Sequence, residues 1–200
     1  MLRIKNLSKR YGDHVVFQGL SRTFAPGCYA LCEEENTGKS TLLGIIGGAI
    51  SPDGGDVSID GCSLVNDPDH FMACVSYVPD DCLLYPAMTG RQLLEQKAHE
   101  KDAPLSAEVL DFAYELGLHE HLDKRFEQMS TGTRRKVFLA AAALGSPAVI
   151  VADGPSNGLD TAARAVLAQR FADWARDRVV LFASHDAELV KVSHQFSIRP

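Results

Sequence analysis

The sequence has no excess of positive charge and no long apolar run. Its 200 residues carry 20 Lys and Arg against 26 Asp and Glu, a net charge of −6. This balance argues against nucleic acid as the main partner, because phosphate backbones are bound by clustered basic side chains, and the run Arg134-Arg135-Lys136 is too short to change it. No apolar stretch approaches the ~20 residues of a membrane-spanning helix, and the N-terminus lacks a signal-peptide core. We therefore expect a cytoplasmic protein unless a partner holds it at a membrane.

The sequence also lacks the cysteine pattern of a metal or disulfide framework. Its five cysteines are an odd number, with no C-x-x-C pair, which favours buried, reduced thiols. We interpret His119-Glu120-His121 as a polar loop at a helix end, because nothing nearby completes a coordination sphere. With 46% hydrophobic and 23% charged residues, the chain has the composition of one soluble domain with a sizeable core.

What the sequence does contain is an alternation of strand and helix patterns. Strands are expected at 2–9, 17–24, 28–32, 57–64 (a hairpin), 71–78, 148–152, 178–183 and beside the C-terminus. Helices are expected at 39–49, 89–127 (in short segments), 137–144, 161–176 and 187–192. This alternation indicates a mostly parallel sheet, whose ligands bind at the carboxyl ends of the strands.

Serine and threonine residues mark the helix starts of a helical insertion. Thr89 and Ser106 precede apolar helical patterns, and Ser130 precedes another in the segment 129–136. We expect one domain, with a catalytic core formed by 1–86 and 129–200 and a helical subdomain at 87–128.

The segment 33–41, EEENTGKST, joins an apolar strand to a helix that begins near Lys39. Its last four residues (38–41) aim backbone N–H groups and a helix N-terminus at phosphate oxygens, with Lys39 on the outer phosphates and the Ser40 hydroxyl on Mg²⁺. This is the second half of a P-loop. Considered alone, the four residues could also be an ordinary helix start.

The first half of this segment departs from the P-loop pattern. Glu33 and Asn36 stand where glycines are common. Asn36 can adopt the left-handed conformation, but Glu33 would be strained by roughly 1–2 kcal/mol if it had to. Three carboxylates at 33–35 would also repel an anion, by roughly 2 kcal/mol for a unit pair at about 7 Å. We expect a weakened phosphate site.

Other polar side chains fall at expected strand ends. Lys39, Asp80, Asp153 and His185 all lie at carboxyl ends of predicted core strands. Tyr11 follows the first strand, where it could be a packing residue or a stacking platform for a nucleobase.

Taken in order, these motifs resemble the nucleotide-binding subunit of ABC transporters. The resemblance covers nearly the whole chain and rests on Tyr11, GKST at 38–41, YVPDD at 77–81, MSTGTRRK at 129–136, VIVADGPSNGLD at 149–160 and LFASHD at 181–186. It implies an α/β P-loop NTPase fold of the ABC type, with a mostly parallel core sheet, an N-terminal antiparallel β region and a helical insertion.

The resemblance also implies ATP and Mg²⁺ as ligands. Asp153 and His185 would be the catalytic residues, since Asp153 orients Mg²⁺ with Ser40 and His185 reaches the γ-phosphate. Asp80 is a further candidate for Mg²⁺. Nucleotide would be bound by Tyr11, Asn36, Thr37, Gly38, Lys39, Ser40, Thr41, Ser130 and Gly132. Ser130 and Gly132 match the signature motif, which in this family touches the γ-phosphate of ATP held by the opposite subunit. Leu159-Asp160 match the D-loop at the dimer interface.

Three departures from the family pattern concern the chemistry. Gly154 replaces the Glu that polarises the attacking water, Asp80 replaces the Q-loop Gln, and the P-loop carries Glu33 and Asn36. Loss of a general base lowers the rate of hydrolysis by about 10²–10⁴-fold. We therefore expect little hydrolysis at this chain's own site. Asp80 or Glu35 acting as a substitute base remains an alternative.

The leading hypothesis is a degenerate ATP-binding subunit of an exporter-type ABC transporter, which supplies an intact signature motif to a partner ATPase. Its partners would be a transmembrane permease and a second ATP-binding subunit, a heterodimer being favoured. The permease would dock beside 80–86, where Leu83, Leu84 and Tyr85 form an apolar cluster; the alternative is that this loop only packs on the chain's own helices. It would then lie on the inner face of the cell membrane. The alternatives are a non-catalytic regulatory module of ABC fold and an ABC-type ATPase without a membrane partner.

Overall fold

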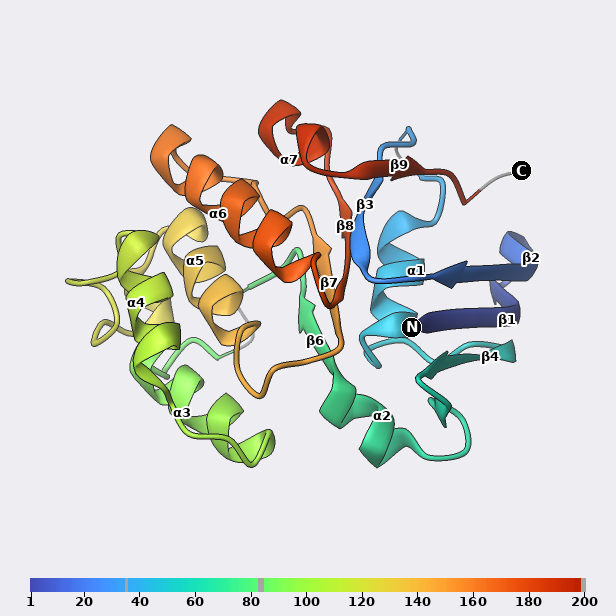
Figure 1. The fold of residues 1–200 in the computed structure, drawn as a ribbon, viewed down its shortest axis with the longest axis horizontal. Coiled ribbons are helices and arrows are strands. Elements are labelled where there is room, and N and C mark those ends of the chain that lie inside the picture. Colours follow the sequence, from blue (N-terminus) through green and yellow to red (C-terminus); the bar gives the residue numbers. More distant parts are fainter. Residues whose placement is uncertain (35, 83–84, 199–200) are drawn as a thin grey trace.

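The chain folds into two sheets with a helix between them (Figure 1). The computed structural model describes residues 1–34, 36–82 and 85–198. The N-terminal sheet is antiparallel, in the order β2-β1-β4-β5. Its strands are β1 (Leu2–Tyr11), β2 (His14–Phe24), β4 (Gly54–Ile59) and β5 (Cys62–Ser63). The hairpin predicted at 57–64 is confirmed as β4 and β5.

The second sheet is parallel throughout, in the order β6-β7-β8-β3-β9. Its strands are β3 (Gly27–Leu31), β6 (Val75–Val78), β7 (Val149–Asp153), β8 (Val179–Ala183) and β9 (His194–Phe196). Every residue of β7 and β8 is buried, which explains their continuous apolar sequence, because a parallel sheet is covered on both faces. The predicted α/β fold, with a parallel core sheet and an antiparallel N-terminal region, is confirmed.

Helices begin where capping residues predict them. Thr89, Ser106 and Ser130 each accept a hydrogen bond from the backbone N–H three residues later and so satisfy a donor that the first helical turn leaves open. The helices are α1 (Lys39–Ile46), α2 (Pro68–Cys74), α3 (Gly90–Glu100), α4 (Ala107–Glu115), η1 (Phe126–Gln128), α5 (Thr131–Ala141), α6 (Thr161–Trp174) and α7 (Ala187–Lys191). In Figure 1, α3 and α4 lie at the end of the molecule opposite the antiparallel sheet.

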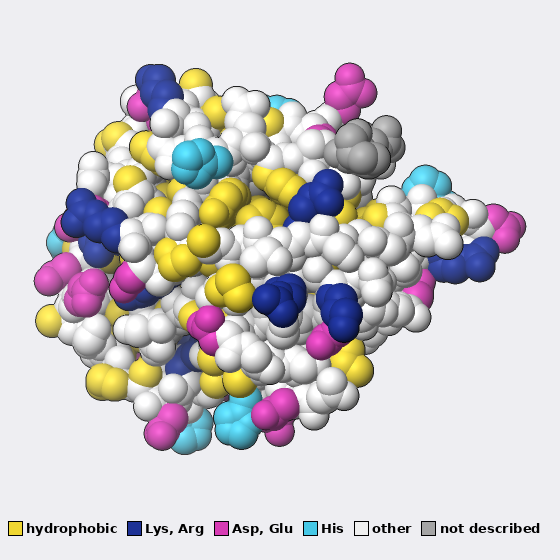
Figure 2. Space-filling view, turned by 45° about the vertical axis from the view of Figure 1, so that its right-hand side comes forward, with side chains coloured by type: hydrophobic (Ala, Val, Ile, Leu, Met, Phe, Trp, Pro, Cys, Tyr) yellow, Lys and Arg dark blue, Asp and Glu magenta, His cyan; other side chains and the backbone are white. Residues whose placement is uncertain are grey.

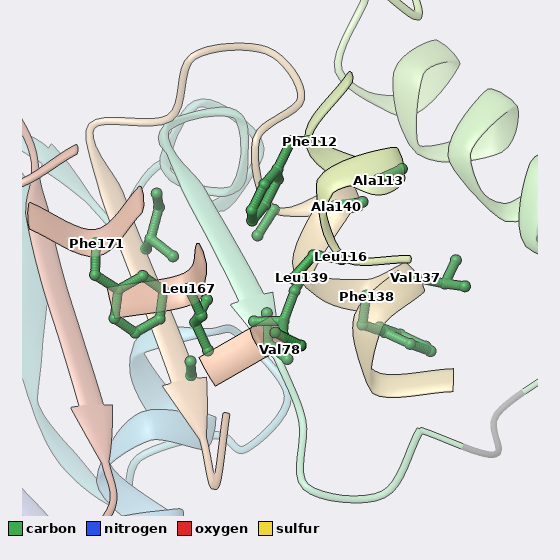
Figure 3. Packing of buried hydrophobic residues seen from close by; sticks show 14 of the residues in the cluster. Val78, Phe112, Ala113, Leu116, Val137, Phe138, Leu139, Ala140, Leu167 and Phe171 are labelled. Carbon is green, nitrogen blue, oxygen red and sulfur yellow. The ribbon is translucent and has the colours of Figure 1, made fainter. Parts of the chain in front are cut away.

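Two hydrophobic clusters use opposite faces of the parallel sheet. Alternate residues of β7 and β8 point to opposite sides, so that Ile150 and Phe182 pack with α3–α6, while Val151 and Leu181 pack with α1 and the antiparallel sheet. Figure 3 shows Leu139 of α5 lying toward Val78 at the end of β6. Helix α5 therefore connects the helical region to the edge of the parallel sheet.

The strand predicted at 71–78 is partly wrong. Residues 68–74 form α2, and the strand begins at Val75. Asp67 is the N-cap and Pro68 occupies the first turn, where the fixed φ of proline and its missing N–H cost nothing. A short apolar run such as FMAC does not distinguish a helix from a strand by periodicity.

The surface carries charges of both signs. On the described part of the face in Figure 2, Lys and Arg side chains stand among Asp and Glu side chains. Within residues 1–34, 36–82 and 85–198, no helix is long and apolar enough to cross a membrane, and no group of three or more potential metal ligands is clustered. The cysteines are free, and burial raises the pKa of Cys28 to about 12.

Candidate functional site

The loop before α1 curves around the side chain of Lys39. Lys39 Nζ donates to the carbonyl oxygen of Glu33 at 2.6 Å and also to that of Glu34. An ammonium group has three donors, so the bonds to these two described residues leave one N–H of Lys39 for a ligand. Asn36 (φ 62°) and Gly38 (φ 95°) both take positive φ, as the P-loop pattern predicts for these positions.

Glu33 faces away from this loop's interior. Its Oε1 accepts hydrogen bonds from Ser197 Oγ at 2.6 Å and from the Ile198 backbone N–H at 3.0 Å. Glu33 does not have a positive φ, so the strain considered for it does not arise. The carboxylate instead ties the start of the P-loop to the C-terminal segment. Glu35, considered as a substitute base, lies outside the described residues.

Ser40 and Asp153 meet at the end of β7. The Ser40 hydroxyl is hydrogen-bonded to the Asp153 carboxylate, and Asp153 is only 8% exposed. Burial raises the pKa of Asp153, and the bond from Ser40 opposes this rise. A carboxylate and a hydroxyl are the hard oxygen donors that Mg²⁺ prefers. The donor set therefore fits Mg²⁺.

A first cavity of about 430 Å³ lies between the P-loop and the β1–β2 turn. Tyr11 is 50% exposed there, and Lys9 Nζ lies 5.3 Å from the centre of its ring. The lining residues are Tyr11, His14, Val16, Asn36, Gly38, Lys39, Ser40 and Thr41. His14 and Val16 were missed by the sequence reasoning, although a tight Gly12-Asp13 turn brings His14 opposite Tyr11.

A second cavity of about 550 Å³ joins the carboxyl ends of three parallel strands. It brings together four of the residues predicted for the site: Lys39, Asp80, Asp153 and His185. Asp80 follows β6, Asp153 ends β7 and His185 follows β8. Such an edge is where ligands of open parallel sheets bind.

Arg135 of α5 is buried behind this second cavity. Only 2% of it is exposed. Its Nη1 donates to the carbonyl oxygens of Asp153 (2.9 Å) and Gly154 (2.6 Å), while its Nη2 donates to Asp80 O (2.7 Å) and Asp80 Oδ1 (3.0 Å). The guanidinium thus fixes Asp80 next to the end of β7. In the sequence, Arg135 belongs to a short basic run and to the segment 129–136, and neither pattern predicts this buried position.

A side chain at Gly154 would displace two neighbouring side chains. Its φ is 54°, and a Cβ atom there would lie 2.3 Å from Asn157 Nδ2 and 2.9 Å from Asp80 Oδ1. Asn157 Nδ2 also donates to Asp80 Oδ1 at 3.2 Å. The space in which a residue-154 side chain would begin is therefore taken by Asp80 and Asn157.

The signature residues Ser130 and Gly132 lie away from these two cavities. Ser130 is exposed and caps α5, accepting from Thr133 N at 3.1 Å. Gly132 packs so closely that a Cβ there would lie 2.1 Å from the carbonyl oxygen of Gly158. Neither Ser130 nor Gly132 lines the two cavities described above. Asp160 caps α6 and accepts from Lys136 Nζ at 2.7 Å.

Comparison with known proteins fits this arrangement. The sequence profile described as "ABC transporter" matches residues 18–157. The chain belongs to the ABC transporter family. A structure described as the ATP binding subunit of an ABC transporter superposes with a TM-score of 0.85 at 25% identity, over 98% of this chain and 85% of that one.

Two curated ABC relatives differ in how much of their length this chain spans. It is 33% identical over 196 residues to the Nod factor export ATP-binding protein I of Burkholderia lata, covering 92% of this chain but 62% of the relative. It is 29% identical to the lipoprotein-releasing system ATP-binding protein LolD of Bacteroides fragilis, covering 96% of this chain and 94% of the relative.

Proposed function

We propose that this chain is the ATP-binding subunit of an ABC transporter of the exporter type. The observation that carries the proposal is the meeting of Lys39, Ser40 and Asp153 at one edge of the parallel sheet, beside two cavities. The similarity to relatives named for Nod factor export and lipoprotein release supports an export role.

Each ligand group has a partner in this proposal. Lys39 and the first turn of α1 bind the phosphates, helped by the helix N-terminus, and Tyr11 stacks on the base. Bound Mg²⁺ would neutralise phosphate charge, held by Ser40 and Asp153. His185, exposed at the end of β8, reaches the terminal phosphate from the second cavity. The remaining phosphate contacts come from Asn36, Thr37, Gly38 and Thr41.

Hydrolysis at this chain's own site is proposed to be slow. Gly154 offers no carboxylate, and the side chains of Asp80 and Asn157 occupy the space where one would begin. The signature motif is better preserved than the P-loop, since Ser130 caps α5 and lies exposed at the N-terminus of this helix. The chain would then pair with a second, intact ATP-binding subunit and complete that subunit's site with Ser130 and Gly132.

The permease would dock in a groove of about 840 Å³ between the core and α3. Tyr77 and Tyr85 line it together with Asp80 and Asp81, so it suits a basic amphipathic helix. Lys101 Nζ holds α3 against the end of α2 by donating to the carbonyl oxygens of Met72 and Ala73, both at 3.2 Å, and to that of Val75. Leu83 and Leu84, predicted to belong to this surface, lie outside the described residues. Such docking would hold the subunit on the inner face of the membrane.

A titration with fluorescent mant-ATP tests the proposal. We expect saturable binding that requires Mg²⁺ and is lost in Lys39→Ala. Binding that ignores both Mg²⁺ and Lys39 would instead favour a non-catalytic regulatory module of ABC fold. A matched control is Lys124→Ala, since Lys124 is an exposed lysine of the helical region, and this variant should bind as the parent does.

A further inference from the structure

Among the described residues, three carboxylates line the second cavity, and they differ in how their oxygens are bound. They are Asp80, Asp153 and Asp186. Asp153 is hydrogen-bonded to Ser40. Asp186 caps α7 through Oδ1 and pairs through Oδ2 with Arg164 at 3.4 Å.

Asp80 differs from the other two carboxylates. Its bonds from Arg135 and Asn157 both go to Oδ1. Within the described part of the chain, Oδ2 has no hydrogen-bond partner, and the side chain is 62% exposed. This oxygen is therefore available to a water molecule in the cavity.

The position of Asp80 is fixed rather than accidental. Arg135 holds both its backbone carbonyl and its side chain, and the same guanidinium holds the carbonyl oxygens at the end of β7. The charge-assisted hydrogen bond from this buried arginine restricts the orientation of the Asp80 carboxylate. Its Oδ1 lies 2.9 Å from the point where a Cβ of residue 154 would stand.

We propose that Asp80 supplies the carboxylate that polarises the attacking water for the slow hydrolysis at this chain's own site. The inference rests on the proposed function, because it requires bound Mg-ATP. The water oxygen forms a bond to the γ-phosphorus, the bond from that phosphorus to the bridging oxygen breaks with its electron pair leaving on ADP, and the water proton passes to Asp80 Oδ2. Arg135 and Asn157 are positioning residues, and Gly154 leaves room for them.

The test compares Asp80→Asn with Asp80→Glu in the full chain, measuring mant-ATP affinity and phosphate release in the same preparations. An Asn retains an oxygen that can accept from Arg135, so the fold is kept, but it cannot take a proton. We expect Asp80→Asn to lower phosphate release about 100-fold while the Kd for Mg-ATP changes less than threefold. Asp80→Glu should recover part of the rate, because it restores a carboxylate.

The control is Asp123→Asn. Asp123 is also paired with an arginine, Arg91, at 2.7 Å, and its side chain is 72% exposed, but it lies in the helical region. It should release phosphate at the parental rate.

Three outcomes would overturn the inference while leaving the proposed function standing. The first is Mg-dependent binding with no measurable phosphate release by the parent, and the second is unchanged release in Asp80→Asn. The third is a raised Mg²⁺ requirement for binding in Asp80→Asn, which would make Asp80 a metal ligand instead. Absence of Mg-dependent binding in the parent would overturn the proposed function itself.

Discussion

The P-loop and the carboxyl end of β7 both depart from the ABC pattern, but with different structural consequences. At the P-loop, the Glu33 carboxylate binds Ser197 and Ile198 and neither cavity includes it. At β7, the change to Gly154 alters the site itself, because Asp80 and Asn157 occupy the side-chain space.

This difference separates binding from chemistry. The phosphate loop keeps its curvature through Lys39 and the positive φ of Asn36 and Gly38. Glu33 replaces a glycine, but its side chain makes its contacts outside the cavities, so nucleotide binding is little affected. Gly154 replaces a carboxylate that takes part in the reaction, so the reaction itself is affected. We therefore expect retained nucleotide binding together with slowed hydrolysis.

The largest effect is expected when the P-loop and the signature motif of this chain are mutated separately in the assembled pair of ATP-binding subunits. Ser130→Arg removes the cap of α5 and fills the space before it, so ATPase activity of the pair should fall by about 100-fold or more. Lys39→Ala should change the same activity less than about threefold, since this chain's own site is proposed to contribute little turnover.

Ser106→Arg is the matched control for this pair of variants. Ser106 caps α4 in the same way, but it lies in the helical region and should leave the ATPase activity of the pair near the parental value. The reverse pattern, in which Lys39→Ala stops turnover and Ser130→Arg does not, would contradict the division of roles. Equal turnover from a symmetric homodimer would contradict the heterodimer.

A large stability effect is expected at Arg135. Arg135→Ala removes the buried guanidinium that donates to the carbonyl oxygens of Asp80, Asp153 and Gly154, which should cost roughly 3 kcal/mol of unfolding free energy. Arg91→Ala, which removes an exposed ion pair with Asp123, should cost about 1 kcal/mol or less. Chemical denaturation measures the unfolding free energy of both variants. Equal losses in the two variants would show that the buried hydrogen bonds of Arg135 do not stabilise the site.

Restoring the missing carboxylate directly should fail. Gly154→Glu places a side chain at φ 54° and against Asn157, so we expect a loss of about 1–2 kcal/mol from the left-handed backbone alone and no gain in turnover. Gly12→Glu is the control for stability, because Gly12 has φ 58° and nothing within 4 Å of a Cβ. A rise in turnover in Gly154→Glu would show that the site accommodates a residue-154 carboxylate.

The smallest effect is expected at Glu33. The sequence alone predicts that Glu33→Gly tightens Mg-ATP binding by tenfold or more, whereas the contacts of Glu33 now predict a change below about threefold. Amide hydrogen exchange at 194–198 should become faster, since the carboxylate no longer holds Ser197 and Ile198. The control, Glu34→Gly, should leave the exchange rate at 194–198 unchanged. A tenfold gain in Mg-ATP affinity in Glu33→Gly would show that the Glu33 carboxylate repels the bound nucleotide after all.

Local signals in the sequence were sufficient for much of the fold. Capping by Thr89, Ser106 and Ser130, and the continuous apolar runs of β7 and β8, predicted elements that the structure confirms. The error at Phe71 arose because an apolar run of four residues fits a helix and a strand equally well.

The contacts that distinguish the site could not be predicted in this way. Arg135 binds groups from the ends of β6 and β7, and Glu33 binds a segment more than 160 residues later in the chain. Such partners meet only when the sheet order and register are known. Residue type alone therefore placed Asp80 and Asp153 at strand ends, but not the guanidinium between them.

The most direct test of the account is a single-turnover experiment. Excess protein is loaded with radiolabelled Mg-ATP, and bound nucleotide and released phosphate are followed in the same sample. The account predicts full, Mg-dependent binding followed by phosphate release far slower than one per second. Release at several per second, or nucleotide that stays unbound in the presence of Mg²⁺, would contradict it.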